Sequence, residues 1–253
     1  MTAATDGERM DAVRRAPVAV VVPAKDEAAR IGVTVRALRG LQGVAAVVVV
    51  DDGSSDRTAS LASSAGAEVV RLERSYGKAD SLMSGLGRVA GLQRVGRLSP
   101  DAVVLLADAD LETSAGDLGV LVDPVARGEA DLTIAAPPSR ETEGGGLGLV
   151  IGLARRGVEE LTGVVVAHPL SGLRCLSPAA VTAATPFARG WGVEVGMTVD
   201  VLDAGLVVRE VPCDLRRRVT GGDWRAQVHR AAQYRDIALA LGVRRLRRRL
   251  GPT

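Results

Sequence analysis

The sequence predicts an α/β fold with a mostly parallel central sheet flanked by helices, and three observations carry this prediction. Four consecutive valines, Val47 to Val50, lead directly into Asp51 and Asp52, as in a strand that is buried on both faces and ends in a polar turn. Short apolar runs alternate with amphipathic segments through the first half of the chain, which is typical of parallel strands joined by helices. Aromatic residues make up only 2% of the chain, so aliphatic side chains must fill the core.

The first half of the chain is expected to alternate strands and helices. Each apolar run predicts a strand, and apolar residues at helical spacing predict a helix. In the first helix these residues are Ile31, Val35 and Leu38, and Gly40 ends it. In order, we expect a strand over 18–22, a helix over 26–39, the strand that ends at Val50, a helix over 56–64, a strand over 68–72, a helix from Lys78, and strands over 101–107 and 131–135.

The second half is less regular. Residues 137–148 are rich in proline, glutamate and glycine, a composition typical of a mobile loop over a site. Pro212 places the strand before it at an edge of the sheet, because proline lacks the N–H that a central strand donates. We expect a helix over 150–161, a short strand over 172–176, a helix over 193–202, the edge strand over 206–211, and a long helix with one apolar face at Trp224, Val228, Ala231, Ile237 and Leu241.

Length and composition predict one domain. We expect it over residues 17–242, after a flexible N-terminal extension over 1–16 and before a basic tail over 243–253. Lys and Arg total 32 against 30 for Asp and Glu, so the charge does not indicate a nucleic-acid partner. No signal-peptide core and no unbroken apolar span is present, which predicts a cytoplasmic protein. Two distant cysteines indicate neither a disulfide framework nor a zinc site.

Pairs of carboxylates follow two of the expected strands. Asp108 and Asp110 stand two residues apart, so both can project from one face and share a divalent cation. Asp51 and Asp52 end another strand, and ligands of open parallel sheets bind where the carboxyl ends of strands meet the loops. We therefore expect one shared site. A solvated turn is the alternative for the Asp-x-Asp pair, because so short a motif is common by chance.

Four motifs, in this order, resemble those of family 2 glycosyltransferases: Pro23-Ala-Lys-Asp-Glu27, Val50-Asp-Asp-Gly-Ser-Ser-Asp56, Gly77-Lys78 and Asp108-Ala-Asp110. The resemblance implies a GT-A fold with a Rossmann-like sheet. Pro169-Leu-Ser-Gly-Leu-Arg174 is similar to a segment of polyprenyl-phosphate sugar transferases such as dolichyl-phosphate mannose synthases. Gly190-Trp-Gly-Val-Glu194-Val-Gly is similar to a segment of glucosyl-3-phosphoglycerate synthases. The resemblance covers about residues 17–220.

The resemblance implies roles for these positions. A nucleoside-diphosphate sugar, a UDP- or GDP-sugar, would be held by Pro23, Ala24, Glu27, Asp52, Gly53, Ser54, Lys78, Asp108 and Ala109. Asp108 and Asp110 would bind Mg²⁺ or Mn²⁺, and this cation and Lys78 would offset the charge that grows on the leaving diphosphate. A solvated helix start is the alternative for Lys78, and a carboxylate at a helix N-terminus is the alternative for Glu27.

Glu194 and Arg174 are the expected catalytic residues. Glu194 lies among glycines and valines, where an isolated carboxylate is costly to bury, so we expect it to act as an acid, a base or an acceptor-orienting group. Its alternative is a salt bridge to an arginine. Arg174 would hold an acceptor phosphate through two hydrogen bonds, beside Ser171 and Gly172, and its alternative is an ordinary ion pair.

Two departures from the relatives leave the acceptor open. His168 replaces the aspartate that the lipid-phosphate relatives carry, and Leu215-Arg-Arg-Arg218 offers no histidine to complete a metal shell, unless His229 folds back. We expect metal-dependent transfer to a phosphorylated acceptor such as a polyprenyl phosphate, with inversion. The alternatives are a retaining transferase acting on a small phosphorylated acid and a nucleotide-sugar-binding protein without turnover.

Arginines dominate the C-terminus. Arg244, Arg245, Arg247, Arg248 and Arg249 share it with Leu246 and Leu250. A basic segment gains about 1 kcal/mol per arginine near an anionic leaflet, so we expect peripheral contact with the inner face of the membrane. A solvated, frayed tail is the alternative.

Overall fold

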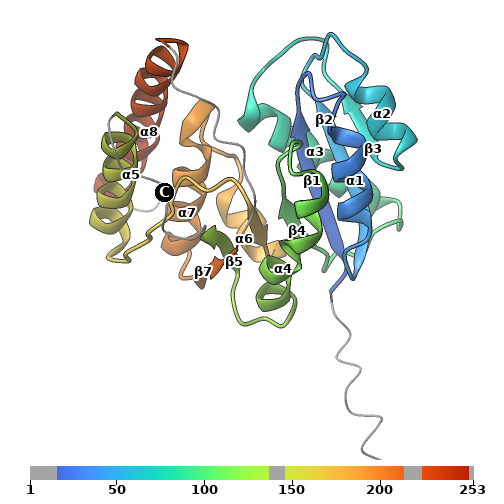
Figure 1. The fold of residues 1–253 in the computed structure, drawn as a ribbon. Helices are drawn as coiled ribbons and strands as arrows, with labels where there is room; N and C mark the ends of the chain where they lie inside the picture. The colour runs from blue at the N-terminus through green and yellow to red at the C-terminus, as the bar shows by residue number, and fades with distance from the viewer. Residues whose placement is uncertain (1–15, 137–145, 214–223, 251–253) are drawn as a thin grey trace, which may run out of the picture.

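The computed structural model describes residues 16–136, 146–213 and 224–250. In this part of the chain a seven-stranded sheet lies between two layers of helices (Figure 1). The strands are β1 (Val18–Ala24), β2 (Val44–Asp51), β3 (Glu68–Arg71), β4 (Val103–Leu106), β5 (Leu132–Ala136), β6 (Arg174–Leu176) and β7 (Val208–Pro212). Their order is β3-β2-β1-β4-β6-β5-β7, and all neighbours are parallel except β6, which is antiparallel to β4 and β5. The expected mostly parallel sheet is confirmed.

The described α-helices are α1 (Ile31–Arg39), α2 (Thr58–Ser64), α3 (Lys78–Arg94), α4 (Gly119–Ala126), α5 (Gly146–Thr162), α6 (Pro178–Ala184), α7 (Val193–Asp203) and α8 (Trp224–Leu250). Two 3₁₀ helices, η2 (Glu112–Leu118) and η3 (Gly190–Gly192), lead into α4 and α7. Each face of the sheet has its own apolar cluster, because alternate strand residues point to opposite faces. Ala19 and Val21 of β1 belong to the cluster that includes α3, α5, α6, α7 and α8, whereas Val18, Val20 and Val22 belong to the cluster that includes α1, α2, η2 and α4.

The order in which the chain adds strands to the sheet reverses at β1. The chain runs outward from β1 to β2 and β3, and then returns to place β4 on the other side of β1. In open α/β sheets such a switch point opens a crevice outside the carboxyl ends of the two strands. The Pro23 and Asp108 motifs both lie at this edge.

Several boundaries differ from the prediction. The first helix begins at Ile31 instead of residue 26, because Asp26 takes a positive φ of 53° and residues 27–30 form a turn. α5 begins at Gly146, so the last three residues of the expected loop over 137–148 are helical, and residues 137–145 lie outside the described part. The segments that form η2, α4 and α6 were not predicted as helices. The edge position of the strand that ends at Pro212 is confirmed.

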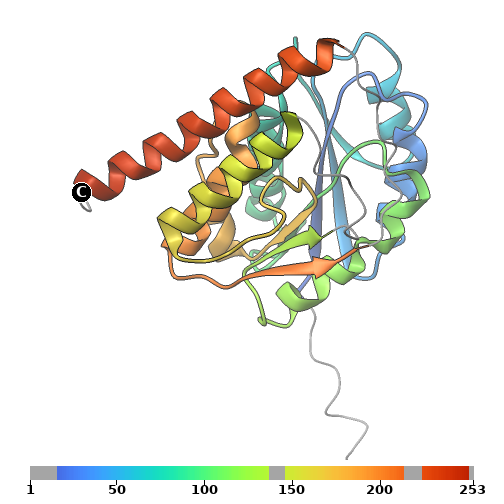
Figure 2. The same ribbon diagram turned by 60° about the vertical axis from the view of Figure 1, so that its left-hand side comes forward.

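α8 is longer than expected, because it continues unbroken to Leu250 (Figure 2). Residues 243–250, which were expected to belong to a basic tail after the domain, instead continue this helix. Ile237 and Leu241 are buried as predicted, but Ala231 is exposed, and the side chains of Trp224 and Val228 lie outside the described part. None of the helices in the described residues is long and apolar enough to span a membrane.

Candidate active site

The loop after β2 is organised by two buried carboxylates. Asp51 Oδ1 accepts the Ser54 N–H at 3.0 Å, whereas Asp51 Oδ2 makes no hydrogen bond and lies 3.6 Å from Arg71 Nε. Asp52 accepts the Tyr76 N–H at 2.8 Å, the Ser75 hydroxyl at 2.7 Å and the Gly77 N–H at 3.0 Å. Burial opposes the ionisation of Asp52, but these hydrogen bonds outweigh it and lower its pKa.

Asp52 therefore fixes the segment that enters α3. Residues 75–77 each donate a hydrogen bond to its carboxylate, and Lys78 is the first residue of the helix that follows. Gly77 has a φ of 92°, which a glycine adopts without strain. Sequence analysis expected Asp52 to contact the nucleotide; in the structure its three hydrogen bonds also position Lys78.

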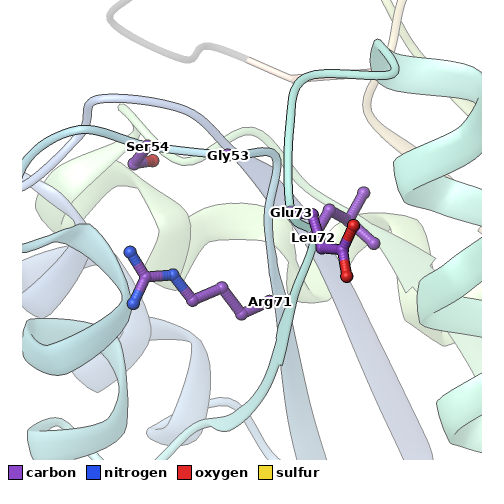
Figure 3. A pocket seen from close by; sticks show the side chains of 5 residues that line it. All are labelled: Gly53, Ser54, Arg71, Leu72 and Glu73. Carbon is purple, nitrogen blue, oxygen red and sulfur yellow. The ribbon is translucent and has the colours of Figure 1, made fainter.

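A pocket of about 460 Å³ lies beside this loop, lined by Gly53, Ser54, Arg71, Leu72 and Glu73. Figure 3 shows the Arg71 side chain extending below the Gly53–Ser54 segment. The Glu73 carboxylate lies on the opposite side of the backbone that carries both residues. Gly53 has a φ of 68°, and a Cβ there would lie 2.6 Å from the Arg74 carbonyl carbon. Only glycine permits this approach of the two backbones, so the shape of the pocket wall depends on Gly53.

The loop after β1 is tied to the loop after β2. Asp26 donates its N–H to Ser54 Oγ at 2.9 Å, and Glu27 donates its N–H to Thr58 Oγ1 at 2.8 Å. The Ala24 carbonyl, next to the half-buried Pro23, accepts the Asp52 N–H at 2.8 Å.

The two motifs thus form one continuous wall. The Glu27 carboxylate binds Arg30 at 2.6 Å. It therefore forms an ion pair in the turn that leads into α1, where the Glu27 carbonyl accepts the Ile31 N–H, so Glu27 lies at the N-terminus of that helix.

Four segments converge on the Lys78 ammonium. Its Nζ lies 2.9 Å from Glu194 Oε1 on α7 and 3.5 Å from Asp108 Oδ1 after β4. Gly172, just before β6, closes over them: a Cβ there would lie 2.3 Å from Lys78 Nζ and within 3.6 Å of both carboxylates. We name Lys78, Asp108, Gly172 and Glu194 the Lys78 cluster. The structure thus brings together residues that the sequence expected in the donor, metal, acceptor and catalytic roles.

The partner of Glu194 is a lysine. Sequence analysis weighed a salt bridge to an arginine against a catalytic role, and the structure replaces that arginine by Lys78. The Glu194 side chain is 8% exposed and that of Lys78 is 27% exposed, so the pair is largely shielded from water but reaches the surface. Such a pair holds the ammonium in place at the carboxyl edge of the sheet, where it can meet an anionic ligand.

Arg174 does not reach the surface, so the expectation that it grips an acceptor phosphate is wrong for this conformation. It is fully buried, and burial lowers its pKa to about 10, against the pull of Glu194 and Glu210. Its donors bind the Ser171 carbonyl at 2.7 Å, the Pro169 carbonyl at 2.7 Å and Thr198 Oγ1 at 2.8 Å. Arg174 is thus a positioning residue that fixes the loop carrying Gly172, and among the described residues it makes no ion pair, which was its alternative.

Glu210 on β7 binds the loop before β6, and sequence analysis missed this contact. Its carboxylate accepts the N–H of Ala167 at 2.9 Å and that of His168 at 2.6 Å, and lies 3.0 Å from His168 Nδ1. The imidazole that replaces the relatives' aspartate therefore faces a carboxylate. A glutamate between Arg209 and Val211 in the edge strand was the only signal in the sequence.

Asp108 and Asp110, the expected metal ligands, offer two carboxylates to a cation. Asp108 is half-buried and Asp110 is exposed, and the loop between them is fixed to α1 because Thr34 Oγ1 donates to the Ala109 carbonyl at 2.8 Å. No group of three metal-binding side chains occurs among the residues that the structure describes, and residues 215–218 and the His229 side chain lie outside them. Two carboxylates alone fit a cation such as Mg²⁺ or Mn²⁺ that takes its remaining ligands from water and a diphosphate.

Comparison with known proteins gives three results. Residues 19–165 match the family described as Glycosyl transferase family 2. The chain is 31% identical over 121 residues to the undecaprenyl-phosphate 4-deoxy-4-formamido-L-arabinose transferase of Pectobacterium carotovorum subsp. carotovorum, a match of 44% of this chain and 34% of that protein. The chain thus spans about a third of the length of that curated relative.

Solved structures match most of the chain. The fold is similar to glucosyl-3-phosphoglycerate synthase of Mycobacterium tuberculosis, with a TM-score of 0.70 and 27% identity over 90% of this chain and 80% of that one. The same synthase in complex with Mn²⁺, uridine diphosphate and glucosyl-3-phosphoglycerate matches with a TM-score of 0.68 and 27% identity, over the same shares of the two chains.

Proposed function

The chain belongs to glycosyl transferase family 2 and is a glycosyltransferase with the GT-A fold, and we propose that it transfers a sugar from a nucleoside-diphosphate donor to a phosphorylated acceptor. The observation that carries this proposal is the Lys78 cluster. It places an ammonium, two carboxylates and an acceptor-side glycine within a few ångströms at the switch point of the sheet. A uridine-diphosphate sugar is the proposed donor, because the related synthase binds uridine diphosphate.

The donor half of the site suits a nucleoside diphosphate. The pocket at Gly53 and Ser54 would receive the nucleoside, and Lys78 would face the diphosphate. Because Glu194 and the Asp52-bound segment hold Lys78 in position, its charge is organised before the sugar–phosphate bond breaks. We assign Asp108 and Asp110 to a Mg²⁺ or Mn²⁺ ion, since the related synthase was crystallised with each; when bound, this ion supplies further positive charge to the diphosphate.

We take a polyprenyl phosphate as the leading acceptor, as in the name of the curated relative. A phosphate oxygen would attack the anomeric carbon from the side opposite the diphosphate, which inverts that centre. The new carbon–oxygen bond forms while the bond to the nucleoside diphosphate breaks, and the diphosphate leaves with the electron pair. A phosphate monoester is largely dianionic at neutral pH, so this nucleophile needs no strong base.

A small phosphorylated acid is the second candidate, with retention at the anomeric carbon. The observation that favours it is coverage: the synthase structures match 90% of this chain, whereas the curated relative matches 44%. Those structures include complexes with phosphoglyceric acid.

Two measurements test the proposal. A thermal-shift panel of nucleoside-diphosphate sugars with and without Mn²⁺ identifies the donor, because a ligand at 100 times its Kd stabilises the native state by about 2.7 kcal/mol. Release of the nucleoside diphosphate is then measured with a short-chain polyprenyl phosphate and with 3-phosphoglycerate. Binding without any turnover would leave a nucleotide-sugar-binding protein and overturn the proposed transfer.

Glu194→Gln separates the two acceptors. The amide keeps a hydrogen bond to Lys78 but cannot take a proton, so with a phosphate nucleophile we expect kcat to fall by less than about tenfold. A loss of several thousandfold at unchanged donor affinity would show a hydroxyl nucleophile that Glu194 deprotonates, and would exclude the leading candidate.

A further inference from the structure

α8 has two apolar faces, and only one of them is covered. Ile237, Ala240, Leu241 and Arg244 are buried against the body of the protein. A second row, which we name the α8 stripe, consists of Leu239, Val243, Leu246 and Leu250, which are 61%, 49%, 56% and 76% exposed. Their spacing of four, three and four residues places them on one side of the helix, away from the buried row.

Arginines border the α8 stripe on both sides. At 100° per residue, Arg247 and Arg249 fall on opposite flanks of the row, and both are exposed. Neither lies within ion-pair distance of an acidic side chain in the described part of the chain, although Arg247 interacts electrostatically with Asp200 over a longer distance. By contrast, the other three arginines form ion pairs: Arg244 with Asp200, Arg245 with Glu160 and Arg248 with Asp203. The five arginines are therefore not one basic tail: three fasten α8 to the protein, and two face outward beside an apolar row.

We propose that the α8 stripe docks on an anionic lipid surface, with α8 lying in the plane of the headgroups. A helix with exposed leucines between arginines buries its apolar row at the acyl boundary while the guanidinium groups meet the phosphates. Figure 2 shows that the C-terminal end of α8 projects beyond the rest of the protein, so the protein body leaves that end accessible.

Charge decides between a lipid surface and a second copy of the chain. Asp236 is the sole acidic residue of α8, and it already accepts the Trp191 N–H at 3.2 Å and pairs with Arg235. Two α8 stripes packed together would place Arg247 and Arg249 of both copies along one seam without acidic partners. An anionic surface neutralises the same charges.

Docking would bring the Lys78 cluster to the membrane through a short, closely packed connection. Gly192 lies so near α8 that a Cβ there would be 2.6 Å from the Ala240 Cβ and 2.8 Å from the Asp236 carbonyl oxygen. Glu194 follows two residues later in α7. The docking itself is independent of the proposed function, but its use, the delivery of the site to a lipid-linked phosphate, rests on that function.

The test is co-sedimentation of the full chain with vesicles of phosphatidylcholine alone or with an equal part of phosphatidylglycerol. We expect sedimentation with the mixed vesicles only, and release as the salt approaches about 0.5 M, where charges more than a few ångströms apart are screened. Arg247→Gln with Arg249→Gln, and separately Leu239→Gln with Leu246→Gln, should each lower the partition coefficient about tenfold or more. The matched controls are Arg94→Gln, an exposed arginine of α3, and Leu149→Gln, a 69% exposed leucine of α5, which should change nothing.

Equal sedimentation with neutral vesicles, or equal losses in the control variants, would overturn the docking. So would a dimer in light scattering that the stripe variants abolish, since it would make a second copy the occupant. In every variant, the thermal midpoint without ligand reports folding, and the shift of that midpoint on adding the donor reports the donor site. A wild-type protein that transfers sugar without sedimenting refutes the docking alone, and one that sediments without transferring refutes the proposed function alone.

Discussion

Asp52 shows how one ionised side chain organises the side of the site that we assign to the donor. It is a buried carboxylate with three hydrogen bonds from residues 75–77, and those bonds keep its pKa below the ordinary value of 3.8. A group with a depressed pKa in the folded state stabilises that state above its unfolded pKa. This contribution is lost as the pH falls from about 4 through the folded pKa.

Asp52→Asn is therefore expected to lower the free energy of unfolding by about 1–3 kcal/mol at pH 7, because an amide cannot accept all three hydrogen bonds. The difference from wild type should shrink as the pH falls below about 4, where the wild-type carboxylate itself becomes protonated. Urea unfolding at several pH values measures this, with the exposed Asp117→Asn as control. A penalty that stays constant down to pH 2 would contradict the assigned hydrogen bonds.

Asp110→Asn tests the metal assignment. The substitution removes one of two expected carboxylate ligands, so transfer should fall about a hundredfold or more, and chelation by EDTA should inactivate the wild type. Asp101→Asn, an exposed aspartate at the other end of β4, should be nearly silent. Equal behaviour of the two variants, or full activity in EDTA, would show that no metal acts at this pair.

For single residues, the sequence predicted which ones lie together more accurately than it predicted the contacts that each one makes. Lys78, Asp108 and Glu194 meet as a group because motifs at strand ends and helix starts carry positional information. Arg174 was misassigned, since the sequence does not show that its guanidinium is enclosed by Pro169, Ser171 and Thr198. Glu210 was missed because its partners, the N–H groups of a distant loop, leave no trace in the sequence.

At the scale of elements, the glycines around Glu194 are explained by helix packing. Cβ atoms at Gly192 and Gly196 would meet α8 at 2.6 Å and 2.7 Å, so glycine lets η3 and α7 lie directly on that helix. The motif that resembles a catalytic segment is thus also a packing surface, and the position of Glu194 depends on α8.

Gly192→Ala should destabilise the protein by about 1–3 kcal/mol, because the Asp236 carbonyl oxygen belongs to the α8 backbone and cannot move aside. Gly87→Ala in α3, where a Cβ meets nothing within 4 Å, should instead stabilise by about 0.4–1 kcal/mol. Chemical denaturation of both variants tests whether Gly192→Ala lowers and Gly87→Ala raises the free energy of unfolding. A neutral Gly192→Ala would mean that η3 and α8 are not held together as described.

Elements with strong periodic signals were predicted, and those set by tertiary contacts were not. The start of α3 at Lys78 and the edge strand β7 follow from local sequence. The antiparallel direction of the three-residue β6 depends on the two strands it inserts between. The continuation of α8 to Leu250 depends on acidic partners in α5 and α7, which offset charges that would otherwise repel.

At the scale of the whole molecule, the two halves of the chain contribute opposite walls of one site. Residues 18–110 supply Lys78, the Asp pair and the loops that we assign to the nucleotide, and the segment from Gly172 to Glu194 supplies the proposed acceptor side. The parallel sheet and its switch point were predictable from apolar runs and their polar ends. The alignment of the second half was not, because its contacts are long-range and its strands are short.

The claim that unites these observations is that the diphosphate departs against the ammonium of the Lys78 cluster. The most direct test is the rate of sugar transfer by Lys78→Gln, in which a polar side chain without charge replaces the ammonium. Arg94→Gln, at the other end of the same helix, is the matched control. We expect transfer by Lys78→Gln to be about a hundredfold or more below wild type at a temperature where the variant is folded, with the Arg94→Gln rate nearly unchanged. A Lys78→Gln variant that folds and transfers sugar at the wild-type rate would contradict the account.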